Sequence, residues 1–424
     1  MKLLFENIKE LVQIRDASVD FVAGAKMKEL PTIKNAFLLI EDGLIKDFGP
    51  MKDAPIGPMD ETIDATGKMI LPSWCDSHTH LVYAGNREGE FVDKINGLSY
   101  EEIANRGGGI LNSAEKLAQT SEDDLYQQSI ERLEEIIQLG TGAVEIKSGY
   151  GLSLDAELKM LRVIQRLKSN YDIQIKATFL GAHAIPKNYK NDKAGYLKLL
   201  VEELMPIIAK EKLADYVDIF CESGYFSAED TDFILKAGQK YGLIPKIHVN
   251  QFTSIGGVQV GVKYNALSVD HLEVMTNDDI EALKGTKTMP VALPSCSYFL
   301  SIPYTPVREM MEAGLPIALA TDYNPGSTPS GNMNFVVATA CIKMKMTPEE
   351  AINAATINGA YAMGLEQVVG SITRDKKANI ILTKPIHSYA SIPYLFGSNL
   401  IDRVFLDASR YKACLVSTSN QNVP

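Results

Sequence analysis

The middle of this chain alternates short apolar strands with helical segments, and this alternation restricts the fold more than any other feature. Eight strands are expected, at Trp74–His80, Ala143–Ser148, Ile175–Gly181, Val217–Glu222, Lys246–Asn250, Leu267–Glu273, Met289–Pro294 and Ile317–Asp322. Strands that alternate with helices form parallel sheets, and eight of them favour a closed barrel. A doubly wound open sheet is the alternative, but no G-x-G-x-x-G follows the first strand.

Helix boundary signals support this alternation. Apolar residues between Leu125 and Ile137 follow the three-to-four spacing of an amphipathic helix, and Gly140 offers a stop. The run from Ser227 to Asp230 resembles a capping box with Asp in place of Glu. Pro348 is a suitable first-turn residue for a further helix. The segments between the strands are therefore predicted to be helical.

Both ends of the chain are β-like. Strands on either side of Asp42-Gly43 predict a hairpin, and another strand is expected near Lys68–Leu71. Short apolar strands without an intervening helix are expected at Asn379–Leu382, Arg403–Leu406 and Cys414–Ser417. The predicted architecture is an α/β (β/α)8 TIM-type barrel over residues 71–365. A small, β-sandwich-like domain is predicted from residues 1–70 and 366–424.

Composition excludes several classes of protein. The 424 residues carry a formal net charge of −11, which argues against a nucleic-acid partner. No apolar run is long enough to span a membrane, and the N-terminus turns polar at Glu6, before a secretory segment could form. The five cysteines are widely spaced, without a C-x-x-C pair, so no disulfide framework is expected. A reduced, cytoplasmic enzyme is predicted.

Histidines gather where the predicted strands end. Of six histidines, only His387 lies in the C-terminal tail; the other five fall at or just after strand ends, namely His78, His80, His183, His248 and His271. A single histidine there is more often a hydrogen-bonding residue. Five at one face indicate an active site, because barrel enzymes build their sites at the C-terminal ends of the strands.

The motif His78-Thr79-His80 lies on the first expected strand. Residues two apart in a strand project to the same face, so both imidazoles can reach one point. With His248 on the fifth strand and Asp322 on the eighth, they suit one divalent cation. The alternative for Asp322 is a cap or turn residue before Asn324-Pro325-Gly326.

This distribution of histidines and aspartate resembles the amidohydrolase superfamily. Longer stretches resemble one of its families, the imidazolonepropionases, from about residue 70 to about residue 365: Gly107–Ile110, Glu145–Leu152, Phe179–Pro186 and Ala320–Ser327. Binuclear members of the superfamily carry a lysine at the end of strand four, where this chain has Phe220-Cys221-Glu222. Lys147 lies on strand two instead, so one metal ion is expected.

The resemblance implies roles for individual residues. His78, His80, His248 and Asp322 would hold one zinc or iron ion per chain. The residues implied in binding a small anionic heterocycle are Arg87, Tyr100, Tyr150, His183, Gln251, Asn324, Gly326 and Ser327. An arginine can hold a carboxylate bidentately, which a protein of net charge −11 needs for an anionic ligand. The Gly107–Gly109 loop is expected either to close over the site or to be a flexible connector.

The implied reaction is hydrolysis of 4-imidazolone-5-propanoate to N-formimidoyl-L-glutamate, a step of histidine degradation. Metal-activated water would attack the ring carbonyl. His271 would act as base or stabilise the oxyanion, and Asp322 could pass the proton to the leaving nitrogen. The family pattern H-A-D-E-F is here His248-Val249-Asn250-Gln251-Phe252, and Gln251 can hydrogen-bond the ring but cannot transfer a proton near neutral pH.

Two other functions fit the sequence less well. One is a deaminase or cyclic-amide hydrolase that acts on another heterocycle, for which a carboxylate pocket at Arg87 would serve no purpose. The other is a degenerate binding protein, against which stands the presence of every candidate metal ligand. A homodimer is expected from the family resemblance alone.

Overall fold

Eight parallel strands form a nearly closed barrel in the order β13-β12-β11-β10-β9-β8-β7-β6, in a computed structural model that describes residues 1–98, 102, 108–407 and 409–410. Each strand overlaps one expected from the sequence: β6 Trp74–Thr79, β7 Thr141–Lys147, β8 Gln174–Ala182, β9 Tyr216–Cys221, β10 Ile244–Val249, β11 Ser268–His271, β12 Met289–Ala292 and β13 Ala318–Leu319. The barrel prediction is confirmed, and the open-sheet alternative is wrong.

The first and last strands are joined by backbone hydrogen bonds at their C-terminal ends. The Asp322 amide donates to the His78 carbonyl at 2.9 Å, and the His80 amide donates to the Tyr323 carbonyl at 2.8 Å. These bonds close the ring on the side where the predicted metal ligands lie. Closure therefore brings the first and eighth strands together at the expected site.

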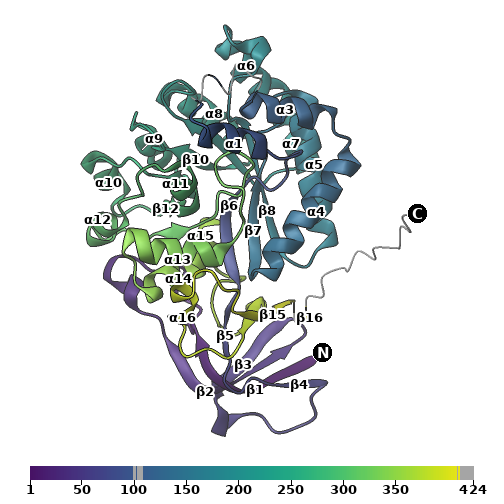
Figure 1. Cartoon of the computed structure of the whole chain (residues 1–424), viewed down its shortest axis with the longest axis vertical. Coiled ribbons are helices and arrows are strands. Elements are labelled where there is room, and N and C mark those ends of the chain that lie inside the picture. Colours follow the sequence, from purple (N-terminus) through teal and green to yellow (C-terminus); the bar gives the residue numbers. More distant parts are fainter. Residues whose placement is uncertain (99–101, 103–107, 408, 411–424) are drawn as a thin grey trace.

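Helices cover the outside of the barrel in Figure 1. Their bounds are α1 Glu88–Ile95, α3 Ile110–Gln119, α4 Glu122–Gln138, α5 Leu154–Asn170, α6 Lys193–Leu199, α7 Met205–Glu211, α8 Ala228–Lys240, α9 Gly257–Lys263, α10 Asn277–Leu283, α11 Pro294–Leu300, α12 Val307–Glu312, α13 Met333–Met344, α14 Pro348–Ala355 and α15 Ile357–Ala362. A π-helical turn, Leu200–Leu204, joins α6 to α7.

The predicted helix boundaries are present. Ser227 and Asp230 form a reciprocal capping box at the start of α8, and α14 begins at Pro348. Gly140 follows α4 with φ of 100°, a left-handed conformation that only glycine adopts without strain. Helix α4 consequently ends directly before β7.

Both chain ends contribute to a separate eight-stranded sheet, as predicted. Its strands are β1 Lys2–Val12, β2 Thr32–Glu41, β3 Leu44–Pro50, β4 Glu61–Asp64, β5 Met69–Pro72, β14 Ile380–Thr383, β15 Ile401–Leu406 and β16 Ser409–Arg410. The β2–β3 hairpin turns at Asp42-Gly43. The strand expected at Cys414–Ser417 lies outside the described residues.

One expectation for the C-terminal end is wrong, because a short helix, α16 Ser391–Tyr394, lies between β14 and β15. Its four residues are too few to show a helical period in the sequence. Ile392 is buried in the barrel core, and α16 contacts α13. Packing against α13, rather than local propensity, accounts for this turn.

The sheet is continuous with the strand that carries the first metal-ligand candidates. Strand β5 pairs with β1 and β14, and only Ser73 separates it from β6. The Asn379 side chain donates to the Gly142 carbonyl at 2.9 Å, which ties the sheet to β7 as well. The sheet therefore fixes the lower end of the barrel in Figure 1, opposite the site.

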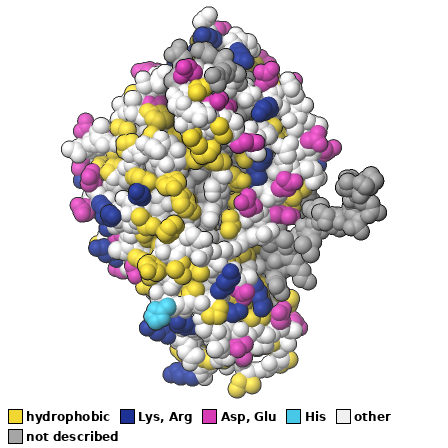
Figure 2. All heavy atoms as spheres, in the orientation of Figure 1, with side chains coloured by type: hydrophobic (Ala, Val, Ile, Leu, Met, Phe, Trp, Pro, Cys, Tyr) yellow, Lys and Arg dark blue, Asp and Glu magenta, His cyan; other side chains and the backbone are white. Residues whose placement is uncertain are grey.

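The surface is mixed in charge. Figure 2 shows acidic and basic side chains interspersed on one face, with apolar side chains gathered towards its middle. Within the part of the chain that the structure describes, every helix is too short or too polar to span a bilayer.

Candidate active site

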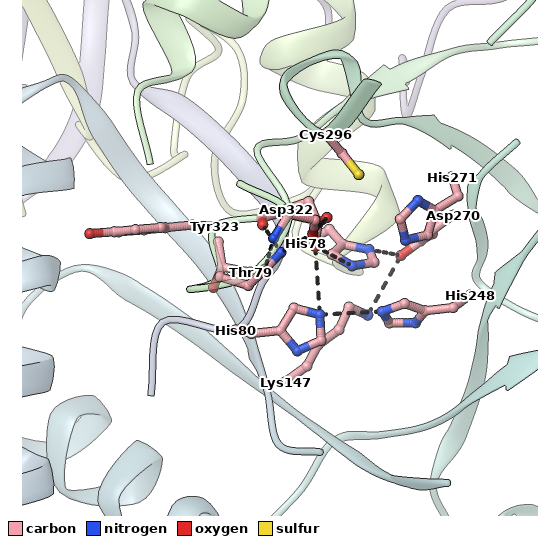
Figure 3. A network of polar contacts seen from close by, with 12 residues as sticks. His78, Thr79, His80, Lys147, His248, Asp270, His271, Cys296, Asp322 and Tyr323 are labelled. Carbon is pink, nitrogen blue, oxygen red and sulfur yellow. Dashed lines mark hydrogen bonds and ion pairs between the residues drawn. The ribbon is translucent and has the colours of Figure 1, made fainter. Parts of the chain in front are cut away.

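Four side chains converge inside the C-terminal end of the barrel: His78, His80, His248 and Asp322 (Figure 3). The Nε2 atoms of His78 and His80 lie 3.5 and 3.7 Å from Asp322 Oδ1. The Nε2 atoms of His80 and His248 are 3.3 Å apart. In a tetrahedral metal site, two ligand atoms that each lie about 2.1 Å from the ion are separated from one another by about 3.4 Å. The spacing therefore fits a single divalent cation.

Two aspartates orient the imidazoles. His78 Nδ1 lies 2.7 Å from Asp270 Oδ2, and His248 Nδ1 lies 2.9 Å from Asp218 Oδ2. Each carboxylate accepts a hydrogen bond from the Nδ1–H of its imidazole, so Nε2 carries the lone pair and faces the centre. His78 Nε2 is buried without a hydrogen-bond partner among the described residues. A buried imidazole nitrogen left in this state is what a metal ion would satisfy.

Burial also sets the protonation states that ligation needs. It lowers the pKa of His78 and His80 well below the ordinary value, and that of His248 to about 3. These imidazoles are therefore neutral at physiological pH and can donate a lone pair. Burial raises the pKa of Asp322 to about 6. A cation at this site would favour the ionised carboxylate.

A buried charge network beneath the ligands was not predicted from the sequence. Lys147 Nζ lies 2.9 Å from Asp218, 3.5 Å from Asp270 and 2.6 Å from Glu145. Lys246 contacts Glu145 from the other side. All five side chains are fully buried. Burial alone would raise the pKa of Asp218, but His248 and Lys147 hold it well below its usual range.

The signal for this network was present in the sequence. Asp218 and Asp270 are charged residues in otherwise apolar barrel strands, where an unpaired charge is costly. Their pairing with Lys147 depends on three different strands, β7, β9 and β11, pointing side chains into the barrel. Strand spacing alone does not give that arrangement.

The predicted substrate-binding residues line one cavity with the metal-ligand candidates. A small cavity of about 60 Å³ is lined by His80, Tyr150, His183, Phe220, His248, Gln251, His271, Asp322, Asn324 and Ser327. It continues into a wider cleft that Arg87 and Gly326 line as well. Tyr100 and Gly107 lie outside the described residues, whereas Gly108 and Gly109 precede α3. The described candidates are thus brought together.

Arg87 is already paired at the mouth of this cleft. Its Nε and Nη2 donate to Glu90 Oε2 at 2.9 and 2.6 Å. Glu90 Oε1 in turn accepts the Gly109 amide at 3.0 Å. A Cβ on Gly326 would lie 2.3 Å from Arg87 Nη1, so the guanidinium packs directly against that glycine. The ion pair fixes Arg87 on one side and leaves its Nη1 against the cleft wall.

His271 and Asp322 share two unusual properties, a left-handed backbone conformation and a raised side-chain pKa. Both have positive φ, 89° and 58°, which is uncommon outside glycine and frequent at functional sites. Burial lowers the pKa of His271, but Glu273, 3.3 Å away, outweighs it, so the pKa is raised overall. His183 differs, because burial lowers its pKa to about 4.

Gln251 and Asn324 make hydrogen bonds within the protein. Gln251 Nε2 donates to Cys296 Sγ at 3.5 Å. Asn324 Nδ2 donates to the Asp322 carbonyl at 2.6 Å and to Ser327 Oγ at 2.7 Å. Ser327 Oγ donates to Asp322 Oδ2 at 3.1 Å. The turn from Asn324 to Ser327 therefore holds the aspartate in place.

A barrel with an H-x-H strand, further histidines on strands five and six, and an aspartate after strand eight defines a metal-dependent hydrolase of the amidohydrolase class. The amidohydrolase family model matches residues 69–410. Imidazolonepropionases of Flavobacterium johnsoniae and Shouchella clausii are 70% and 39% identical, over 96% and 95% of this chain and 99% and 91% of theirs. This chain belongs to the amidohydrolase family and, within it, to the imidazolonepropionases.

Solved structures agree on the fold. Escherichia coli guanine deaminase superposes with a TM-score of 0.75 at 15% identity, over 97% of this chain and 99% of that chain. A zinc-bound adenosine deaminase from Xanthomonas campestris gives 0.71 at 15% identity, over 96% of this chain and 92% of that chain. At this identity the likeness concerns the arrangement of the chain and not its chemistry.

Proposed function

We propose that this protein hydrolyses 4-imidazolone-5-propanoate to N-formimidoyl-L-glutamate. The observation that carries the proposal is one continuous cleft that joins a three-histidine, one-aspartate ligand set to an arginine at its mouth. Relatives named imidazolonepropionase at up to 70% identity, matched along almost the whole chain, support the same activity.

We assign the ion to His78, His80, His248 and Asp322. A divalent ion bound there would lower the pKa of a coordinated water and polarise the ring carbonyl. Histidine and carboxylate ligands suit zinc and iron alike, and one catalytic ion per chain fits these four side chains. The identity and number of ions are to be measured by metal analysis of the purified protein.

The substrate's propanoate group is assigned to Arg87, Tyr150 and His183, with Tyr100 as a further candidate. Nη1 of Arg87 can donate to a carboxylate, and the buried phenol of Tyr150 can donate a second bond. The His183 Nδ1–H donates to the Gly149 carbonyl at 3.1 Å, so Nε2 is left for the cavity and donates to the propanoate once His183 is protonated, a form that a bound carboxylate favours. The ring would lie between this group and the ion, against Gln251, Asn324, Gly326 and Ser327.

We assign proton transfer to His271 and Asp322. Glu273 supports the protonated form of His271, which can therefore accept a proton during attack on the ring. Asp322 lies beside the ligand imidazoles, and its carboxylate would accept a proton from the attacking water and pass it to the leaving ring nitrogen. In this scheme Gln251 recognises the ring by hydrogen bonding and transfers no proton.

The test combines metal analysis with turnover. Loss of imidazolone propanoate absorbance would be followed before and after treatment with a chelator, and after metal is restored. Turnover that disappears with the metal and returns with it is expected. Full metal occupancy without turnover would reject this substrate and favour another cyclic amide or amidine.

We further propose a cytoplasmic homodimer in which residues 71–365 form the catalytic barrel and residues 1–70 and 366–424 form the composite domain. Cys75, Cys221, Cys296 and Cys341 are all free, which fits a reducing compartment. Light scattering of the purified protein measures the oligomeric state.

A further inference from the structure

A second group of metal-ligand types lies beside the proposed metal site. His271, Glu273 and Cys296 each offer one ligand atom, and these atoms lie within 4.8 Å of one another. All three residues are buried. His271 also groups with His78 and His248, so the second set adjoins the first, whereas Glu273 and Cys296 belong to the second set alone. Figure 3 shows the Cys296 sulfur directed towards His271 and Asp322.

One carboxylate oxygen in this group has no partner. Glu273 Oε1 lies 3.3 Å from His271 Nδ1 and 3.5 Å from Ser297 Oγ. Glu273 Oε2 is buried and makes no hydrogen bond with any described residue. A buried carboxylate oxygen without a partner is unfavourable and calls for a bound water or cation.

We propose that His271, Glu273 and Cys296 form a second, inhibitory cation site selective for thiophilic divalent ions such as zinc, cadmium and cobalt. Imidazole, carboxylate and thiolate together are a typical zinc ligand set, whereas magnesium and calcium avoid sulfur. On binding, a metal–sulfur bond forms and the thiol proton is released to solvent.

The site is reached from the substrate cavity. His271 and Gln251 both line that cavity, and the Gln251 amide donates to Cys296 Sγ at 3.5 Å. A glutamine can turn this amide away to admit an ion, and its N–H can also stabilise the thiolate. A cation held here occupies His271, to which proton transfer is assigned. The inhibition, though not the binding, therefore rests on the proposed function.

Cobalt distinguishes the two sites because only the second contains sulfur. Metal-free protein would be titrated with Co²⁺ while the near-ultraviolet thiolate-to-metal charge-transfer absorption is recorded. The first equivalent should produce no such band and the second should produce it. Cys296→Ser should abolish the band, whereas the matched control Cys341→Ser, which removes a partly exposed thiol, should retain it.

Inhibition of turnover by added zinc is the second measurement. Zinc beyond one equivalent should inhibit the wild type, and magnesium should not. Cys296→Ser should need at least about ten-fold more zinc for the same inhibition, as expected when one ligand is lost. A charge-transfer band that is absent, or unchanged in Cys296→Ser, overturns the proposal, and so does equal zinc sensitivity. If imidazolone propanoate is not a substrate, the cobalt spectra still decide whether the site exists.

Discussion

Individual side chains at this site are positioned by the side chains that they contact, some of them distant in the sequence. Arg87 is positioned by Glu90 and by the absence of a side chain at Gly326. His78 and His248 are oriented by aspartates of β11 and β9, which Lys147 holds together. Substitution of single residues can therefore test substrate binding and metal binding separately.

Arg87→Ala is expected to raise KM for imidazolone propanoate by about 10- to 100-fold, because a hydrogen bond to a charged group is lost. Its effect on kcat should be smaller, since Arg87 does not contact the reacting atoms. Steady-state kinetics measures both. Arg87→Lys, which keeps the charge but not the two-pronged geometry, should fall between. An unchanged KM in Arg87→Ala would remove this residue from the carboxylate site.

Lys147→Met is expected to weaken metal binding by about 10- to 100-fold, because two aspartates that orient ligand imidazoles lose their shared cation. Competition with a chromogenic chelator measures the affinity. Lys246→Met is the comparison variant and should weaken metal binding less, since Lys246 contacts Glu145 and its charge acts on Asp270 but not directly on Asp218. An equal loss in both variants, with the fold intact by circular dichroism, would contradict a positioning role specific to Lys147.

At the scale of secondary structure, helices hold the strands of the site in place, and the ends of these helices are fixed by capping. Helix α8 packs against β9 and β10, which carry Asp218 and His248. Its first turn is held by the reciprocal bonds between Ser227 and Asp230. The capping box was readable in the sequence because its residues are neighbours along the chain. The helix α16 was not, because distant packing creates it.

Ser227→Ala is expected to destabilise α8 by about 1 kcal/mol, because the Asp230 amide loses its acceptor. Hydrogen exchange should accelerate in the first turn of α8 before it changes elsewhere. Ser227→Asp keeps an acceptor at the same place and should behave like the wild type. Uniform acceleration across the barrel would show that the cap acts on global rather than local stability.

At the scale of the whole molecule, barrel closure and metal binding should be coupled. The closing bonds at His78 and Asp322 belong to residues that also offer ligand atoms. A ligand that binds only the folded state stabilises it by about 4 kcal/mol at a thousand times its dissociation constant. Metal binding is therefore expected to stabilise the fold.

Removal of the metal by a chelator is expected to lower Tm, and added zinc should restore it. Differential scanning calorimetry measures the shift. His78→Ala, with a broken ligand set, should show a smaller chelator effect than the wild type. A Tm that stays constant while metal analysis confirms removal would contradict the coupling, because an ion that binds only the folded state must raise Tm.

The sequence by itself determined the barrel, the separate sheet and the candidate ligands. Strand and helix periods are local properties, and a barrel turns the ends of all its strands towards one face. His78 and His80 could be paired because two-residue spacing in a strand is a short-range rule.

Only the tertiary structure decided which charges meet. The contacts of Lys147 with Asp218 and Asp270, of Arg87 with Gly326, and the group around Cys296 join residues on different elements. Their distances depend on how the barrel closes and how its interior packs. No local period in a sequence encodes that geometry, because burial and long-range packing fix it together.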